Sequence, residues 1–66
     1  MKVSIDTRTD IMTLLFKENA VVAESDEEKP GIILDFDADG ELVSMEILDA
    51  SRRITRADHV DVETIA

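Results

Sequence analysis

The chain has 66 residues, of which 16 are Asp or Glu and 7 are Lys or Arg, so it carries a net charge of −9 at pH 7. A chain this short forms one domain and buries only about 60% of the surface that its unfolded state exposes, which leaves a thin core. Cysteine is absent and the lone His59 has no partners for a zinc site, so we expect a homodimer to supply the missing stability.

The charge and the hydropathy pattern also argue against several functions. Nucleic acid is disfavoured because phosphates would bind against the field of the whole molecule, and because aromatic side chains that stack on single strands are nearly absent. No apolar run approaches the roughly 18 residues that a membrane-spanning helix needs, and the N-terminus lacks a signal pattern. The sequence therefore predicts a cytoplasmic protein that binds neither membranes nor nucleic acid directly.

The N-terminal part of the chain predicts short strands separated by polar turns. Residues 2–6 alternate polar and apolar side chains, as a half-buried strand does, and residues 7–10 are typical of a turn. Residues 11–16 are apolar on both faces apart from Thr13, which favours a strand covered on both sides and leaves a helix as the alternative. Residues 17–19 then predict another turn.

The next segment changes from apolar to acidic. Residues 20–23 favour an extended backbone, whereas the acidic residues that follow them are typical of a solvated loop. Pro30 and Gly31 predict a clean break before the next element.

Residues 32–48 predict a β-hairpin around Asp39-Gly40, a dipeptide favoured in two-residue turns. This turn segregates the apolar side chains on one face by pairing Phe36 with Val43, Leu34 with Met45 and Ile32 with Ile47. A three-residue loop with a glycine bulge would instead set Phe36 against Leu42 and mix Asp35 with Val43 on one face. We therefore favour the two-residue turn.

The C-terminal part predicts a helical turn and an ambiguous tail. Asp49, Ala50 and Ser51 are cap-type residues ahead of a short helical segment, and beyond residue 55 the pattern fits neither a helix nor a strand throughout. The predicted fold is mainly β (α+β): an antiparallel β-meander of about four strands with a short C-terminal helical segment. We assign residues 1–55 to a single β-meander domain and residues 56–66 to a tail that is helical or flexible.

The stretch from Pro30 to Arg53 carries a recognisable motif. It resembles a family of short prokaryotic proteins catalogued only as a domain of unknown function, with a motif of the type PG(I/V)xLDYDxxGxxxGIEILxAS(K/R)R. The chain departs from this pattern at Phe36, where the family has Tyr, and at Ser44, where Gly is common; Thr13 also stands where the family has an aromatic residue. The resemblance implies a β-meander ending in a short helix and no established enzyme activity. Because such genes lie beside small toxin-like genes, it also raises an antitoxin-like role.

A second motif suggests a calcium site. Asp35, Asp37, Asp39 and Gly40, followed by Glu46, match the spacing of an EF-hand loop. An EF-hand needs a helix on each side of the loop, whereas Pro30 and Gly31 precede an apolar β-type run. Metal binding therefore stays the alternative to a protein-interaction module. The backbone of residues 32–34 discriminates between these two hypotheses, since a helix there would favour metal and an extended backbone the interaction module.

The remaining polar clusters have ordinary structural readings. Asp35 and Asp37 share a strand face but lack a pocket or nucleophile, so we predict that the protein is not an enzyme and uses no cofactor. His59 is read as an exposed tail residue. The basic residues of the C-terminal segment are expected to pair with acids of this molecule or of a dimer partner: Arg52, Arg53 and Arg56.

The sequence favours a non-enzymatic protein-interaction module, antitoxin-like in the sense given above. Its acidic surface would bind a basic protein, and the binding residues are predicted in the acidic stretch: Glu24, Asp26, Glu27 and Glu28. Ile11, Leu15 and Ile33 fall on the less buried side of their strands, so we expect them at a subunit contact or beneath the tail.

Overall fold

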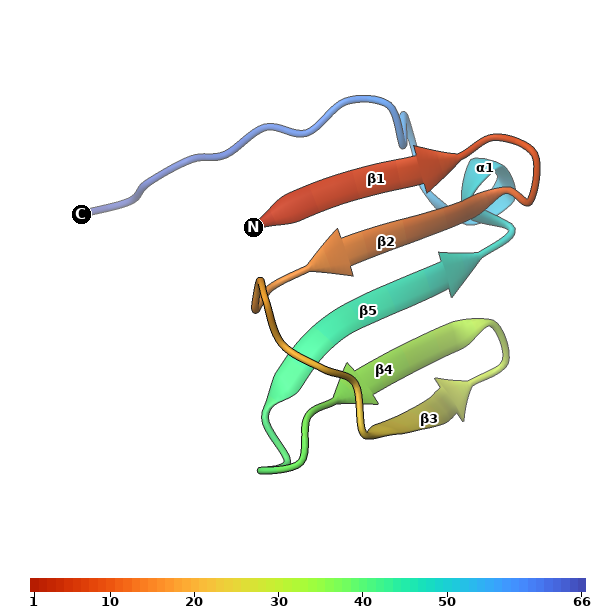
Figure 1. The fold of residues 1–66 in the computed structure, drawn as a ribbon. Coiled ribbons are helices and arrows are strands. Elements are labelled where there is room, and N and C mark those ends of the chain that lie inside the picture. The colour runs from red at the N-terminus through yellow and green to blue at the C-terminus, as the bar shows by residue number, and fades with distance from the viewer.

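The structure, a computed structural model, describes all residues from 1 to 66 as a single antiparallel sheet with one short helix (Figure 1). The elements in chain order are β1 (Lys2–Asp6), β2 (Ile11–Leu15), β3 (Glu24–Lys29), β4 (Ile32–Phe36), β5 (Leu42–Leu48) and α1 (Ala50–Arg53). The predicted class, mainly β with a short C-terminal helix, is confirmed, with five strands where about four were expected. Their order in the sheet is β1-β2-β5-β4-β3, so a hairpin and a three-stranded meander join through β2 and β5.

The turn between β1 and β2 is held by the carboxylate of Asp6. Its Oδ1 accepts hydrogen bonds from the backbone N–H groups of Arg8 (3.0 Å) and Thr9 (3.3 Å). The turn closes where the N–H of Asp10 donates to the carbonyl oxygen of Asp6 at 2.8 Å, and Asp10 adopts a φ of 58°. Aspartate tolerates this left-handed backbone better than bulky residues do, which explains the predicted turn at residues 7–10.

The turn between β4 and β5 differs from the prediction. Within this turn only Gly40 has a positive φ (79°), and the N–H of Asp37 donates to the carbonyl oxygen of Glu41 at 2.9 Å. The loop is therefore the three-residue type with a glycine bulge. Phe36 accordingly pairs with Leu42 and not with Val43.

A second irregularity restores the predicted apolar face. The register shifts next to Phe36, so Val43 has no partner of its own in β4, and from there Leu34 pairs with Met45 and Ile32 with Ile47 as predicted. The carbonyl oxygen of Val43 accepts the N–H groups of both Phe16 (2.8 Å) and Lys17 (3.1 Å), and its side chain is 2% exposed. The bulge therefore corrects the register and also fixes the end of β2.

The acidic stretch is a strand, so the prediction of a loop there is wrong, and residues 20–23, whose sequence favours an extended backbone, form no strand. The reason is the tight turn at Pro30-Gly31, which places the residues just before it opposite β4. Glu24 pairs with Phe36 and Glu27 with Ile33, although all six residues of β3 are exposed. Backbone pairing with an apolar neighbour here outweighs the poor β propensity of the acids.

The core lies between one face of the sheet and the C-terminal segment. Met12, Ile47 and Ala50 form its buried centre, and half-buried apolar residues pack around them: Val3, Ile5, Leu14, Ile32, Met45, Ile54 and Ala57. Asp10 docks α1 on this face, because its backbone oxygen accepts the N–H of Ala50 (2.9 Å) and its carboxylate accepts the N–H (3.0 Å) and hydroxyl (2.7 Å) of Ser51. The cap-type Asp49 makes no side-chain capping bond.

Beyond Arg53 the chain forms no further helix or strand. Ile54 and Ala57 still pack against the core, whereas residues 58–66 are exposed, and in Figure 1 they run alongside β1. The molecule measures 34 × 33 × 20 Å, as expected for one sheet with a small cover on one side. None of its helices has the length and apolar character that a membrane span requires.

Candidate functional site

The side of the sheet that faces away from α1 is covered by no helix. Alternation along the strands places on it the partners of one pairing row, Thr13, Glu46 and Ile33, and of a second row, Leu15, Ser44, Asp35 and Ser25. Ile11 and Leu48 form a third pair. We call this surface the open face and define it by these residues: Ile11, Thr13, Leu15, Ile33, Asp35, Ser44, Glu46 and Leu48.

Asp35 is the most enclosed acid of the open face. It is 4% exposed, and its two carboxylate oxygens accept hydroxyl protons from Ser25 (2.6 Å) and Ser44 (2.7 Å). These serines stand on the strands to either side of β4, at the positions that pair directly with Asp35. A carboxylate buried without a cation is stabilised by such donors, since each contributes a charge-assisted hydrogen bond.

Glu46 completes the cluster as a neighbouring carboxyl. Burial disfavours the charge on Asp35, but hydrogen bonds from Ser25, Ser44 and Glu46 outweigh this effect and hold the pKa of Asp35 below its usual value. The hydrogen bond to Asp35, burial, and repulsion by the Asp35 charge raise the pKa of Glu46. Asp35 is therefore the ionised member, and Glu46 is the member that keeps a proton most readily.

Apolar side chains surround this acid pair. Ile11, Leu15, Ile33 and Leu48 are all half-buried although no helix covers them. Ile54 and Ala57 pack on the opposite face, so the expectation that the tail covers Ile11, Leu15 and Ile33 is wrong. The other expectation, that they lie at a subunit contact, stays a prediction.

The connection from β2 to β3 borders the open face at one end. In Figure 1 residues 16–23 pass in front of β5 and β4, whereas α1 lies behind the sheet. Lys17 donates to Asp37, and the N–H of Ala23 donates to the carbonyl oxygen of Phe36 at 2.7 Å. Hydrogen bonds to Lys17 and to backbone N–H groups lower the pKa of Asp37, and the hydrogen bond to Asp37 raises the pKa of Lys17.

The acids predicted to bind a partner do not form one surface. Glu24 and Asp26 pair with Phe36 and Leu34, which lie on the side of the core, whereas Glu27 pairs with Ile33 of the open face. Glu27 also accepts the N–H of Gly31 at 2.8 Å. All four predicted acids, Glu28 included, are exposed on an edge strand, and their role in binding stays a prediction.

The EF-hand spacing does not produce a metal-binding geometry. Ile32 to Leu34 are extended within β4, the arrangement that favours the interaction module over the calcium hypothesis. Asp37 organises the hairpin turn, where its Oδ1 accepts the N–H groups of Asp39 (3.0 Å) and Glu41 (2.9 Å), while Glu46 lies opposite Ile33. The molecule gathers no group of three or more His, Cys, Asp or Glu side chains placed to hold a metal ion.

Two of the basic residues named from the sequence make contacts within the molecule. Arg52 pairs with Asp49 at 3.1 Å, and Arg53 donates to the carbonyl oxygen of Pro30 at 2.6 Å. His59 is exposed in the tail and lies 3.2 Å from Asp61. Of the three arginines expected to pair with acids, only Arg52 does so within the molecule, whereas Arg53 bonds a backbone carbonyl oxygen and Arg56 makes no ion pair.

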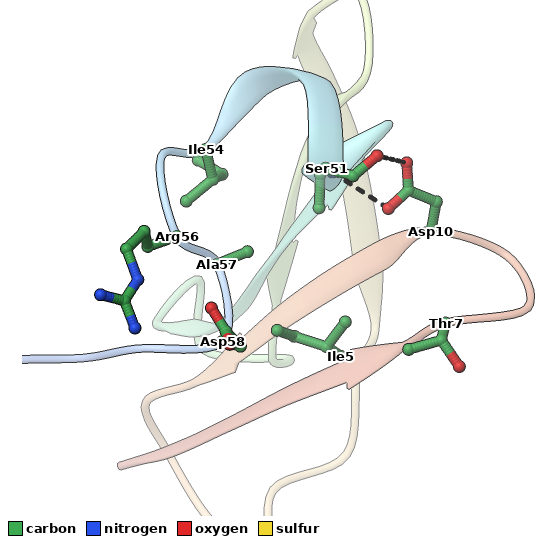
Figure 2. A pocket seen from close by; sticks show the side chains of 9 residues that line it. Ile5, Thr7, Asp10, Ser51, Ile54, Arg56, Ala57 and Asp58 are labelled. Carbon is green, nitrogen blue, oxygen red and sulfur yellow. Dashed lines mark hydrogen bonds between the residues drawn. The ribbon is translucent and has the colours of Figure 1, made fainter.

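One open cavity, about 490 Å³ in volume, lies between β1 and the C-terminal segment (Figure 2). It is on the core side of the sheet, away from the acid pair. Ile5, Ala50, Ile54 and Ala57 supply its apolar wall, and the carboxylate of Asp10 beside it is already bonded to Ser51. The hydroxyl–carboxylate pair in its lining, Ser51 with Asp10, is the one that docks α1, so we read the cavity as the gap beneath a loosely packed tail.

Sequence reasoning did not identify Asp35, Ser44 and Glu46 as a cluster. The missing partner was Ser25, which lies in the stretch taken for a loop. The tight turn at Pro30-Gly31 signals a strand before it, but counting back from that turn sets Asp26 opposite Asp35. The register shift between Glu27 and Lys29 is what brings Ser25 there, and the sequence gives no sign of it.

Residues 2–51 match the model of a family described as Protein of unknown function (DUF2283). No curated protein and no solved structure matches the chain significantly.

Proposed function

Because the chain belongs to the DUF2283 family, whose function is unknown, we propose from its geometry that it is a non-enzymatic protein-interaction module that binds a basic protein through the open face. One observation carries the proposal: the buried carboxylate of Asp35 and the neighbouring carboxyl of Glu46 lie among apolar side chains on a sheet face that no helix covers. The sheet buries its other face against α1 and the residues after it, whereas no helix lies against the apolar side chains of the open face.

The exposed surface supports a docking role. A compact folded chain of this size exposes about 4,200 Å², whereas this chain exposes 5147 Å². The excess is close to the roughly 800 Å² that one partner buries in a standard interface. The exposed tail, residues 58–66, contributes to this excess.

The charge of the open face favours a basic partner over a second copy of the chain. Two copies stacked face to face would bring their Asp35 and Glu46 carboxyls together within an apolar interface, where like charges repel strongly. A partner arginine or lysine would instead stabilise both carboxylates and promote ionisation of Glu46. The net charge of −9 also accelerates the approach of a basic protein.

An antitoxin-like role is one form of this proposal, in which the basic partner is the product of an adjacent gene. The test is a pull-down of that product with the purified chain at micromolar concentrations, and absence of a complex would remove this form. The predicted cytoplasmic location is compatible with it and stays a prediction.

The decisive experiment compares two charge reversals in a tagged chain expressed in its native cell. Glu46→Arg reverses a charge on the open face, and Glu28→Arg makes the same change on β3, where the side chain is exposed. We expect Glu46→Arg to lose the captured partner and Glu28→Arg to retain it, with binding that weakens as salt is raised.

Circular dichroism checks that both variants are folded. If Glu28→Arg alone loses the partner, the docking surface lies on the acidic strand. If neither variant loses it, or if salt has no effect, the proposal of a basic partner on the open face is wrong.

A further inference from the structure

The β1 edge of the sheet has free backbone groups. The N–H of Phe16 donates to Val43 and the carbonyl of Asp10 accepts from Ala50, so the even-numbered residues of β2 point their backbone groups toward β5 and the odd-numbered residues toward β1. The odd-numbered residues of β2 pair with Lys2, Ser4 and Asp6. The outward groups are therefore those of Val3 and Ile5.

The order of residues along this edge is complementary to itself. Centred on Ser4, an antiparallel copy of β1 places Lys2 opposite Asp6 and Val3 opposite Ile5, in both directions along the pair. Val3 and Ile5 thereby become a hydrogen-bonded pair through their outward N–H and C=O groups, and the two opposite charges meet on the other face.

We propose that two copies of the chain pair along β1, antiparallel about a twofold axis at Ser4, and join their five-stranded sheets into one continuous sheet. The proposal is independent of the partner that binds the open face, because that face remains exposed in the dimer. Edge strands present a row of unpaired backbone groups, which natural proteins either protect or use for association.

Only one of the two sheet edges suits this pairing. The strand order sets β1 and β3 at opposite edges, and β3 carries acids that would face acids of a second copy. Pairing through β1 keeps the two β3 strands about nine strand spacings apart, or roughly 43 Å. This separation is several Debye lengths at physiological salt, so their repulsion is screened.

The apolar side of the edge would also gain from pairing. Val3 and Ile5 are half-buried and pack against the core cluster together with Ile54 and Ala57. A second copy of β1 would cover their outer sides with Ile5 and Val3 of that copy, whereas the chain's own tail runs beside β1 without a backbone hydrogen bond to it. The tail is therefore the competing occupant of this edge.

The test reverses one charge in each of two proteins. Lys2→Asp leaves two acids on β1 and Asp6→Lys leaves two bases, so each variant alone sets like charges opposite each other, whereas a mixture of the two restores both pairs. By sedimentation equilibrium we expect the unmodified chain to dimerise, each variant to dimerise on the order of tenfold more weakly, and the mixture to recover. Lys29→Asp, the same change on β3, is the control and should dimerise normally.

Amide hydrogen exchange supplies a second readout. We expect the amides of Val3 and Ile5 to become protected as the protein concentration rises. Protection that is independent of concentration would place the chain's own tail on this edge and overturn the dimer, as would a monomer at high micromolar concentration or a mixture that fails to recover. Asp6 also holds the turn after β1, so Asp6→Lys could unfold the chain. In that case Val3→Pro is the second variant, because proline removes the outward N–H of residue 3. Val3→Pro should weaken the dimer without breaking a hydrogen bond to β2.

Discussion

Replacing Gly31 by alanine separates two contributions that hold the turn between β3 and β4. Gly31 has a φ of 82°, and a Cβ built on it would lie 2.7 Å from Nη2 of Arg53 and 3.1 Å from its Cζ. The guanidinium of Arg53 thus occupies the space that any side chain at this position would need. Its Nη2 donates to the carbonyl oxygen of Pro30 at 2.6 Å, so it can move only by breaking that bond.

The expected loss of stability has two parts. Placing a Cβ on a left-handed backbone costs about 1–2 kcal/mol, and displacing the guanidinium forfeits a partly exposed hydrogen bond worth about 1 kcal/mol. Gly31→Ala should therefore lower the free energy of unfolding by about 2–3 kcal/mol in total. Gly40 is the matched control, because its φ is 79° and a Cβ there would meet nothing within 4 Å. Gly40→Ala should carry only the backbone part.

Urea unfolding followed by circular dichroism measures both losses, and 1 kcal/mol corresponds to a midpoint shift of roughly 1 M for a chain of this size. Repeating the pair in an Arg53→Ala background should bring the two glycine variants to the same loss, because the clash is gone and the backbone strain remains. Equal losses in the unmodified chain, or a difference that survives in the Arg53→Ala background, would refute the role given to the guanidinium.

Further changes test the acid pair, the bulge and the helix docking. The raised pKa of Glu46 means that the folded state holds its proton more tightly than the unfolded chain does, so the free energy of unfolding falls as pH rises above 4.5 through the raised pKa. Glu46→Gln should remove this dependence, so that the urea midpoint changes less with pH across that window and is higher at pH 7. An unchanged dependence of the midpoint on pH would contradict this. Val43→Ala removes a side chain 2% exposed and should lower the free energy of unfolding by about 1–2 kcal/mol, clearly more than Leu42→Ala at 37% exposure. Equal losses at the two sites would argue against the bulge as a packing position. Asp10→Ala removes the carboxylate that docks Ser51 and should speed amide exchange across α1 while leaving β4 protected; uniform exchange through the sheet would mean that the helix does not open separately.

Local patterns in the sequence predicted most of the strands. Alternation located β1, and the segregation of apolar residues located the pairing of Leu34 with Met45 and of Ile32 with Ile47. The turn at Asp39-Gly40 was misassigned because a two-residue turn, and a three-residue loop followed by a bulge at Val43, give the same pairing of Leu34 with Met45 and of Ile32 with Ile47. The sequence offered no visible sign of the bulge at Val43, since its cause lies in β2, which uses the freed carbonyl oxygen.

The acidic strand was missed for the opposite reason. Its composition indicates solvent exposure correctly, since every residue of β3 is exposed, but exposure does not decide whether the backbone is paired. The candidate site was affected in turn: the apolar members Ile11, Leu15 and Ile33 were singled out from the sequence, whereas the enclosure of Asp35 became visible only once Ser25 was placed beside it.

The strand order has a consequence for how the molecule folds. β1 with β2, and β3 with β4 and β5, pair between neighbours along the chain, so each group closes only short loops. The contact between β2 and β5, which pairs Ile11 with Leu48, joins residues far apart in the sequence. Its loop-closure entropy is offset only when both groups have already formed. We expect the rate of folding to be set by this joining step, and the connection from residue 16 to residue 23 to tolerate lengthening with only a small slowing.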